Sequence, residues 1–406
     1  MSNRKLLTVL LALVMAFVLS ACHDNDAPSP GANATPTHTV IVIYPWTGSA
    51  TSASGGLSQS LRANIDSIDA ATQRMGSLGT CRVMLFHATA PHTATLSEIT
   101  VDRGTVNHIP VRTYDGMTYS LPDLVGLLND AVRAAPTGRY SLIIGLHATG
   151  WLPPGSRPQR GLPRPTTGMR RAWGGLSADM QASVERLDSA IRLSAMRHAD
   201  YALFDGCYMA NIETAYALRQ SVTWLVASTS EVLANGMPYQ LTWRELTAEQ
   251  PSWQRVVAAF YGFYSSYRYP YGALSVTDCR VTTDAARLMR RLNDAARTDS
   301  LSLTGLTLQA LDGYTPHVFF DMRQYATLLA SRTPSTGITT DSIGRLFDRL
   351  VPHYCSTPRL YSAFLNGGAS FYVGNNNGGL TISDFTDNAT ARAAVESTAW
   401  WAATRP

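Results

Sequence analysis

The stretch Tyr140-Ser141-Leu142-Ile143-Ile144-Gly145-Leu146 is a short, largely apolar run, and His147 follows it directly. A run of this length and composition is typical of a β-strand that is buried on both faces. Comparable runs occur elsewhere in the chain, at 39–44, 82–86, 201–204 and 224–227. Together these runs predict the strands of one central sheet.

Segments in which apolar residues recur at helical spacing separate these runs. They predict helices over 57–75, 122–134, 176–196, 211–218 and 252–267. Because strands alternate with helices, we expect an α/β fold whose mostly parallel sheet is covered on both faces. The weaker zone 96–111 predicts an edge hairpin. Beyond residue 270 the pattern is mixed, with strands expected over 273–276 and 370–373 and helices over 283–296 and 342–350.

Composition excludes several classes of protein. Hydrophobic residues make up 45% of the chain and charged residues 15%, which is opposite to the signature of a disordered protein. The formal net charge is only +4, so no basic surface suggests a nucleic-acid partner. Neither the histidines nor the widely spaced Cys81, Cys207, Cys279 and Cys355 show metal-ligand spacing, so we expect no metal centre.

The N-terminus predicts export and lipidation. Arg4 and Lys5 precede an apolar stretch from Leu6 to Leu19 that is too short for a comfortable membrane span. The sequence Leu19-Ser20-Ala21-Cys22 resembles a bacterial lipobox, which predicts a signal peptide over 1–21 and a lipid on Cys22. A polar, proline-rich tether would cover 22–37. The alternative is an ordinary cleavage site near a cysteine. We expect anchoring to the bacterial outer membrane, with surface exposure suggested by the acidic residues after Cys22.

Two residues with nucleophile chemistry stand at predicted strand ends. His147 follows the strand at 140–146, and Cys207 follows the strand at 201–204. The ends of neighbouring parallel strands meet at one edge of a sheet, where ligands bind. An imidazole near a thiol can take its proton and later protonate a leaving amine. The alternative interpretation is a small buried cysteine and a hydrogen-bonded structural histidine.

The flanking residues resemble those of the clostripain family of cysteine peptidases, which belongs to the caspase-like clan. In that family an apolar strand precedes His-Gly-x-Gly-Trp, and this chain has Leu142-Ile143-Ile144-Gly145-Leu146-His147-Ala148-Thr149-Gly150-Trp151. The segment from Phe204 to Leu218 is similar to the family's Asp-Ala-Cys-x-Met and Ile-Glu-x-x-Tyr-x-Leu. Ala227-Ser228-Thr229-Ser230-Glu231 and Gly236-Met237-Pro238-Tyr239 match two further motifs. The resemblance covers about residues 38–280.

The resemblance implies a caspase-like three-layer α/β sandwich over 38–270, with a mixed α/β subdomain over 271–406 that completes the fold. It implies an endopeptidase that acts on proteins or peptides, with Cys207 as nucleophile and His147 as proton carrier. The backbone N–H groups of Ala148 and Cys207 would form the oxyanion hole. We expect that no cofactor is required. Only the resemblance suggests a calcium requirement, because some relatives have one. The only membrane contact expected is the lipid anchor, and we expect a monomer.

Two departures from the family pattern bear on activity and specificity. The family has glycine where this chain has Ala148, and alanine would be strained if that position needs a positive φ. The family prefers arginine or lysine at the cleavage site and uses two acidic residues, which fall here on Asp205 and Asn235. We expect a basic preference, with arginine favoured. The alternatives are that Asp205 caps the following helix and that Asn235 is a plain turn residue.

The segment 151–175 predicts a long exposed loop, because it is rich in proline, glycine and arginine. Some relatives cleave themselves between the histidine and cysteine segments, so candidate self-cleavage sites lie at Arg157, Arg160, Arg164, Arg170 and Arg171. A solvated insertion is the alternative. The rival function for the whole chain is an inactive caspase-like surface lipoprotein that binds peptides or a protein partner.

Overall fold

The computed structural model describes residues 35–54, 56–152, 173–175, 180–298 and 307–405, and residues 35–406 form one compact unit. The described part of this unit builds one nine-stranded sheet and three two-stranded sheets. In the order in which they lie, the strands of the large sheet are β12 (His353–Ser356), β10 (Ala273–Asp278), β9 (Val222–Ala227), β8 (Ala199–Asp205), β5 (Tyr140–Gly145), β1 (His38–Tyr44), β2 (Cys81–Ala90), β3 (Thr93–Asp102) and β4 (Thr105–Tyr114).

The centre of the large sheet is parallel and its edges are antiparallel. Strands β9, β8, β5, β1 and β2 pair in parallel, which confirms the predicted α/β fold class. The predicted edge hairpin is also present, because β3 pairs antiparallel with both β2 and β4. At the opposite edge β10 and β12 add two antiparallel strands. The region after residue 270 therefore contributes to the same sheet.

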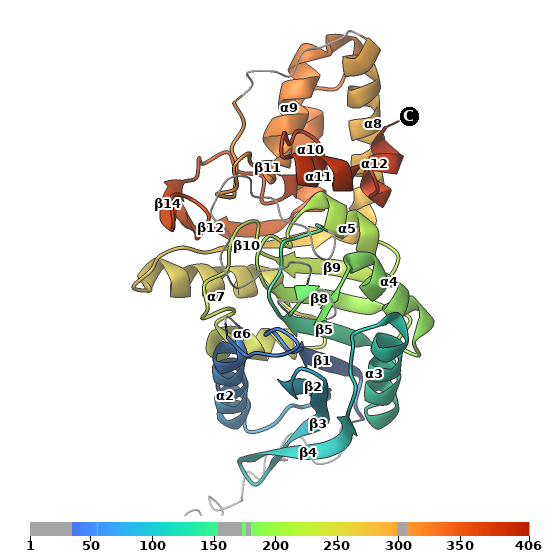
Figure 1. Cartoon of the computed structure of the whole chain (residues 1–406), viewed down its shortest axis with the longest axis vertical. Coiled ribbons are helices and arrows are strands. Elements are labelled where there is room, and N and C mark those ends of the chain that lie inside the picture. The colour runs from blue at the N-terminus through green and yellow to red at the C-terminus, as the bar shows by residue number, and fades with distance from the viewer. Residues whose placement is uncertain (1–34, 55, 153–172, 176–179, 299–306, 406) are drawn as a thin grey trace, which may run out of the picture. The chain divides into compact units, whose positions relative to one another are not determined.

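Helices cover both faces of this sheet (Figure 1). One face carries α2 (Ser58–Met75), α6 (Tyr239–Leu246) and α7 (Trp253–Ser266), and the other carries α3 (Leu121–Ala134), α4 (Val184–Leu193) and α5 (Ile212–Leu218). The remaining α-helices of the described chain are α8 (Thr282–Thr298), α9 (Met322–Arg332), α10 (Thr340–Leu350), α11 (Ala389–Val395) and α12 (Ala399–Thr404).

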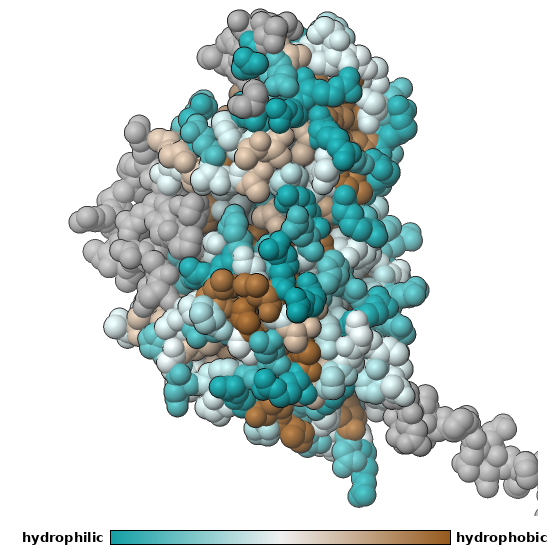
Figure 2. Space-filling model, turned by 90° about the vertical axis from the view of Figure 1, so that its right-hand side faces the viewer, coloured by the Kyte–Doolittle hydropathy of each residue, from teal (hydrophilic) through white to brown (hydrophobic). Residues whose placement is uncertain are grey.

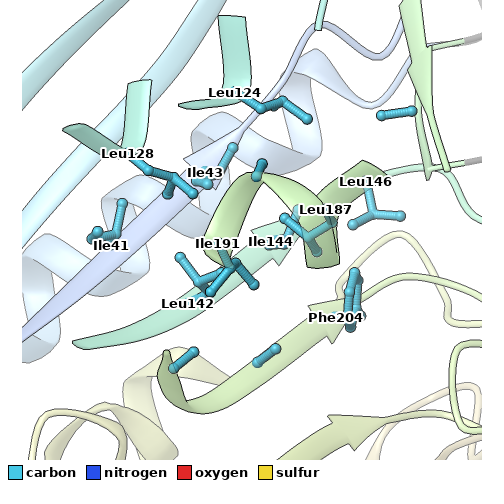
Figure 3. Close-up of a cluster of buried hydrophobic side chains, with 14 of the residues drawn as sticks. Ile41, Ile43, Leu124, Leu128, Leu142, Ile144, Leu146, Leu187, Ile191 and Phe204 are labelled. Atoms are coloured by element: carbon cyan, nitrogen blue, oxygen red, sulfur yellow. The ribbon is translucent and has the colours of Figure 1, made fainter. Parts of the chain in front are cut away.

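Side-chain alternation along β1 explains why the central strands read as continuous apolar runs. Ile41 and Ile43 point into the core beneath α3 and α4, as Figure 3 shows. Val40 and Val42 point into the opposite core, beneath α2, α6 and α7. Each strand must therefore be apolar at every position, which is the expected pattern for a sheet covered on both faces.

The C-terminal helices surround a third core. Residues of α8, α9 and α10 pack there against Ile212 and Tyr216 of α5. Three small sheets lie outside the large one: β6 (Trp173–Gly174) with β7 (Gln181–Ala182), β11 (Phe320–Asp321) with β15 (Thr381–Ile382), and β13 (Arg359–Ser362) with β14 (Ala369–Tyr372).

Some predicted elements were wrong. The helix expected over 176–196 begins only at Val184, because Ser183 caps it and the two preceding residues pair as β7. Helices α6, α9, α11 and α12 were not predicted. The loop expected to be exposed over 151–175 is buried at its described ends, since Trp151 is 5% exposed and Gly174 is buried.

Figure 2 shows the face on which α3 and α4 lie. Its surface is mostly hydrophilic, with small and separate hydrophobic patches. Among the residues that the structure describes, no helix has both the length and the apolar character needed to cross a membrane. Cys22, the predicted lipidation site, lies outside the described residues.

Candidate active site

The register of β5 against β8 sets the candidate site. The two strands are parallel neighbours in which Gly145 lies opposite Asp205. The pairing continues by one further bond, since the Leu146 N–H donates to the Asp205 carbonyl at 3.2 Å. His147 and Cys207 each lie two residues beyond the Gly145–Asp205 pair. Both line one pocket of about 210 Å³, so the structure brings the two sequence-predicted residues together.

Cys207 is half-buried and its sulfur lies against the segment that follows β9. The Val232 N–H approaches Sγ at 3.3 Å, and Sγ lies 3.9 Å from the Val232 carbonyl oxygen. Among the described residues, no disulfide joins Cys81, Cys207, Cys279 and Cys355.

The backbone at His147 is held by a hydrogen bond to the end of the 151–175 segment. The His147 carbonyl accepts a hydrogen bond from the Gly174 N–H at 3.1 Å. Gly174 belongs to β6, which β7 in turn holds. The residue before the histidine is thus bonded to β8, and the histidine itself is bonded to β6.

Ala148 does not carry the strain that the family comparison raised. Positive φ in this segment falls on Gly150, at +65°, and Ala148 is not among the described residues with positive φ. A Cβ at Gly150 would lie 2.7 Å from the Tyr208 carbonyl oxygen, so glycine is required there. Ala148 lines the pocket beside His147 in an ordinary backbone conformation.

Asp205 forms part of the pocket wall, and the alternative that it caps the following helix is wrong. The cap of α5 is Asn211, whose side chain accepts from the Thr214 N–H. Both Asp205 carboxylate oxygens instead accept from the Met237 N–H at 3.0 Å, and Oδ2 also accepts from the Tyr239 hydroxyl at 3.1 Å. Burial raises the pKa of Asp205 to about 6.

Asn235 is not brought to the pocket. Its side chain is exposed, and its Oδ1 accepts a hydrogen bond from the Tyr267 hydroxyl at 2.9 Å. The next residue, Gly236, does line the pocket, and a Cβ there would lie 2.5 Å from Asp205 Oδ2. Of the two predicted specificity residues, only Asp205 therefore faces the pocket.

Apolar side chains make up much of the remaining wall. Leu57 and Leu61 come from the start of α2, and Val232 and Leu233 from the segment after β9. Phe364 comes from the C-terminal region, for which no motif predicted a place at the site. Arg157, Arg160, Arg164, Arg170 and Arg171 lie outside the described residues.

Tyr208 and Glu231 are site residues to which the sequence analysis assigned no role. Tyr208 follows Cys207 directly, has φ of +61° and is fully buried. Its hydroxyl donates to Glu231 Oε1 at 2.7 Å, and Glu231 lines the pocket. The sequence did contain a signal for Glu231, because this acidic residue ends the motif Ala227-Ser228-Thr229-Ser230-Glu231 and had no function assigned to it. In the described chain no group of three or more His, Cys, Asp or Glu residues is placed to hold a metal ion.

Comparisons with known proteins agree with this geometry. The model of the clostripain family matches residues 122–332, just over half of the chain. A secreted C11 cysteine protease from Bacteroides thetaiotaomicron, iotapain, is 29% identical with a TM-score of 0.75, and the match covers 92% of this chain and all of that one. An inactive C11 zymogen from Parabacteroides distasonis shares the fold at 23% identity and a TM-score of 0.74, with 92% of this chain and 99% of that chain covered.

A comparison with curated proteins found no match. The family match spans β5, β8 and β9, which are the strands that carry the candidate site. The fold, a mostly parallel sheet between two helical layers, is the fold of the solved C11 proteases. The chain therefore belongs to the clostripain family and is a cysteine peptidase.

Proposed function

We propose that the protein is a lipid-anchored endopeptidase that uses Cys207 and His147 and cleaves after basic residues, with arginine favoured. The observation that carries the proposal is the shared pocket, in which His147, Cys207 and the buried Asp205 all form the wall. The family match supports a cysteine peptidase, and the register of β5 against β8 supports this choice of residues.

In the proposed mechanism the Cys207 thiolate attacks the carbonyl carbon of the scissile peptide. The C–N bond breaks as the protonated His147 gives its proton to the leaving amine. Water then hydrolyses the thioester, which releases the new carboxylate and restores the thiol. The N–H groups of Cys207 and Ala148 stabilise the oxyanion, and losing one such donor typically costs ~2.7–4 kcal/mol of transition-state stabilisation.

The basic preference rests on Asp205. Asp205 is 8% exposed and lines the pocket, and its carboxylate already accepts hydrogen bonds from the Met237 N–H, the Tyr239 hydroxyl and Asn64 Nδ2. These donors are all neutral, so a guanidinium or ammonium group that enters the pocket would add the charged partner. Because the Asn235 side chain points away from the pocket, the proposal assigns this role to Asp205 alone of the two residues that the family motif suggests. No cofactor takes part in the proposed reaction.

The deciding experiment is cleavage of a fluorogenic peptide library that varies only the residue before the scissile bond. We expect turnover by wild type, with arginine preferred, and none by Cys207→Ala. Asp205→Asn should reduce the preference for arginine over leucine by about 10–100-fold, the value of one hydrogen bond to a charged group. Equal turnover of arginine and leucine peptides by wild type would contradict the basic preference.

The rival function is tested by the same protein. A wild-type chain that neither cleaves the library nor reacts with an arginyl chloromethyl ketone at Cys207 would be an inactive binding protein. Rapid alkylation that Cys207→Ala abolishes would exclude that alternative.

Anchoring and self-processing are tested separately. Radiolabelled palmitate should label the wild-type chain in a bacterial host and should not label Cys22→Ala.

Self-cleavage in the 151–175 segment should give two bands for wild type and one for Cys207→Ala. Identical band patterns would contradict self-processing.

A further inference from the structure

The turn that carries Cys207 has a conformation that residues with side chains rarely adopt. We define residues 206–209 as the nucleophile turn. Within it Tyr208 has φ of +61°, the left-handed region that favours glycine. A tyrosine persists there only where its surroundings over-determine the conformation, and such residues cluster at functional sites.

The backbone and ring of Tyr208 are held from three directions. Its N–H donates to the Ser230 carbonyl at 3.0 Å, and its carbonyl accepts from Asn211 Nδ2 at 2.7 Å. Its ring stacks on Phe319, with centroids 4.9 Å apart and planes 8° from parallel. The side chain is 1% exposed, so the ring has little room to move.

The fourth contact leads to Glu231. The Tyr208 hydroxyl donates to Glu231 Oε1 at 2.7 Å. The same carboxylate accepts from the Ser362 hydroxyl and from the Ala363 N–H, which lies 3.0 Å from Oε2. Ala363 and Phe364 form the part of the pocket wall that comes from the C-terminal region. One carboxylate therefore joins the nucleophile turn to this wall segment, and Glu231 and Ser362 are 131 residues apart in sequence.

We propose that Glu231 is a positioning residue for the peptidase reaction, acting on Cys207 through the Tyr208 hydroxyl and on the pocket wall through residues 362–363. This inference rests on the proposed function of Cys207. Its rival is that Glu231, which also lines the pocket, is a second acidic group that binds a basic substrate side chain. The two roles differ in what they change: positioning affects every substrate and every thiol reagent, whereas binding affects basic substrates alone.

The experiment compares wild type with Tyr208→Phe, Glu231→Gln and the double variant. Three measurements are made: kcat and KM on an arginine and a leucine peptide, the rate of Cys207 alkylation by iodoacetamide followed by mass spectrometry, and the melting temperature. Iodoacetamide is small and uncharged, so it reports on the nucleophile without using the specificity wall.

We expect Tyr208→Phe and Glu231→Gln each to lower kcat by about tenfold or more on both peptides. The first variant removes the hydrogen bond to the carboxylate, and the second replaces the charged acceptor by a neutral one. The arginine-to-leucine preference should stay within about twofold of wild type, and alkylation should slow. The double variant should lose less than the product of the two single losses, because both changes act on the same contact.

Tyr201→Phe is the matched control. Tyr201 is also a buried tyrosine on β8, and its hydroxyl donates to the Leu246 carbonyl at 2.6 Å, away from the pocket. Its melting temperature should fall about as much as that of Tyr208→Phe, while its kcat and alkylation rate should stay at the wild-type values. If Glu231→Gln does not fold, Tyr208→Phe and Ser362→Ala decide the question.

Two results would overturn the proposal. One is unchanged kcat and alkylation in Tyr208→Phe and Glu231→Gln. The other is a selective loss of arginine cleavage in Glu231→Gln with normal alkylation, which would make Glu231 a binding group. A wild type that is alkylated at Cys207 but cleaves no peptide would remove the proposed function, and the alkylation rates would then decide the role of Glu231.

Discussion

At the scale of single residues, the proposed role of the buried Asp205 carboxylate in specificity makes cleavage of basic substrates dependent on pH. Burial raises its pKa to about 6, above the ordinary value of 3.8. The charged form therefore dominates above pH 6 and is lost as the pH falls through that value. We expect kcat/KM for an arginine peptide to fall below about pH 6 more steeply than for a leucine peptide. The ratio of the two, measured from pH 5 to 8, isolates this group because His147 and Cys207 affect both substrates alike.

The variant Asp205→Asn provides the control for that profile. Its ratio of arginine to leucine cleavage should be low and independent of pH over the same range. A pH-dependent ratio in this variant would mean that another group recognises the basic side chain.

Gly150 gives a second prediction at this scale. Gly150→Ala places a Cβ 2.7 Å from the Tyr208 carbonyl oxygen at a residue with positive φ. We therefore expect this variant to lower the free energy of unfolding by about 1–3 kcal/mol. Gly126→Ala is the matched control, because Gly126 lies inside α3 with open space around its Cα. This variant should raise the free energy of unfolding by about 0.5–1 kcal/mol. Denaturant unfolding measures both. Equal effects would show that the close approach at Gly150 has no energetic consequence.

At the scale of elements, α5 carries a buried acid that weakens the fold at alkaline pH. Glu213 is 3% exposed and accepts from the Ser383 N–H at 2.7 Å. Burial and the nearby Asp384 raise the pKa of Glu213 to about 8. Because the folded value lies above the unfolded value, the folded chain holds the extra proton, and stability is lost as the pH rises toward 8 and through it.

We therefore expect Glu213→Gln, which keeps a carbonyl acceptor for the Ser383 N–H, to melt at a higher temperature than wild type at pH 8–9. The advantage should shrink toward pH 5, where wild type is already protonated. Melting curves across this range test the prediction. A constant difference at every pH would contradict a role for the Glu213 proton.

Sequence patterns predicted the central elements well and the peripheral ones poorly, for physical reasons. The strands β1, β5, β8 and β9 are buried on both faces, so their apolar runs stand out without knowledge of their neighbours. Helix α6 begins after Pro238 with no side-chain cap, which leaves no start signal to recognise. The 176–196 prediction followed apolar spacing across a segment where pairing of β7 with β6 prevails.

The same reasoning applies to the site. His147, Cys207 and Asp205 lie at strand ends, and local sequence fixes their place in the sheet. The contact between Glu231 and residues 362–363 joins segments 131 residues apart, and no local pattern encodes such a meeting. Asn235 was expected in the pocket by position in a motif, but the turn directs its side chain toward Tyr267.

At the scale of the whole molecule, the chain crosses the sheet between β5 and β8, and the 151–175 segment lies on that connection. Strands from before the segment (β5, β1, β2) and after it (β8, β9, β10, β12) are hydrogen-bonded neighbours in one sheet. The pairing of Gly174 with His147 adds a further link across it.

A nick anywhere in that connection would consequently yield a two-chain protein whose halves share every layer. We expect the halves to co-elute from a gel-filtration column as one particle of unchanged mass and to separate only in detergent or urea. Cutting the backbone there would break the chain but leave the fold assembled, so the nicked form should have nearly the same melting temperature as the intact form. Elution of two smaller particles under native conditions would contradict this expectation.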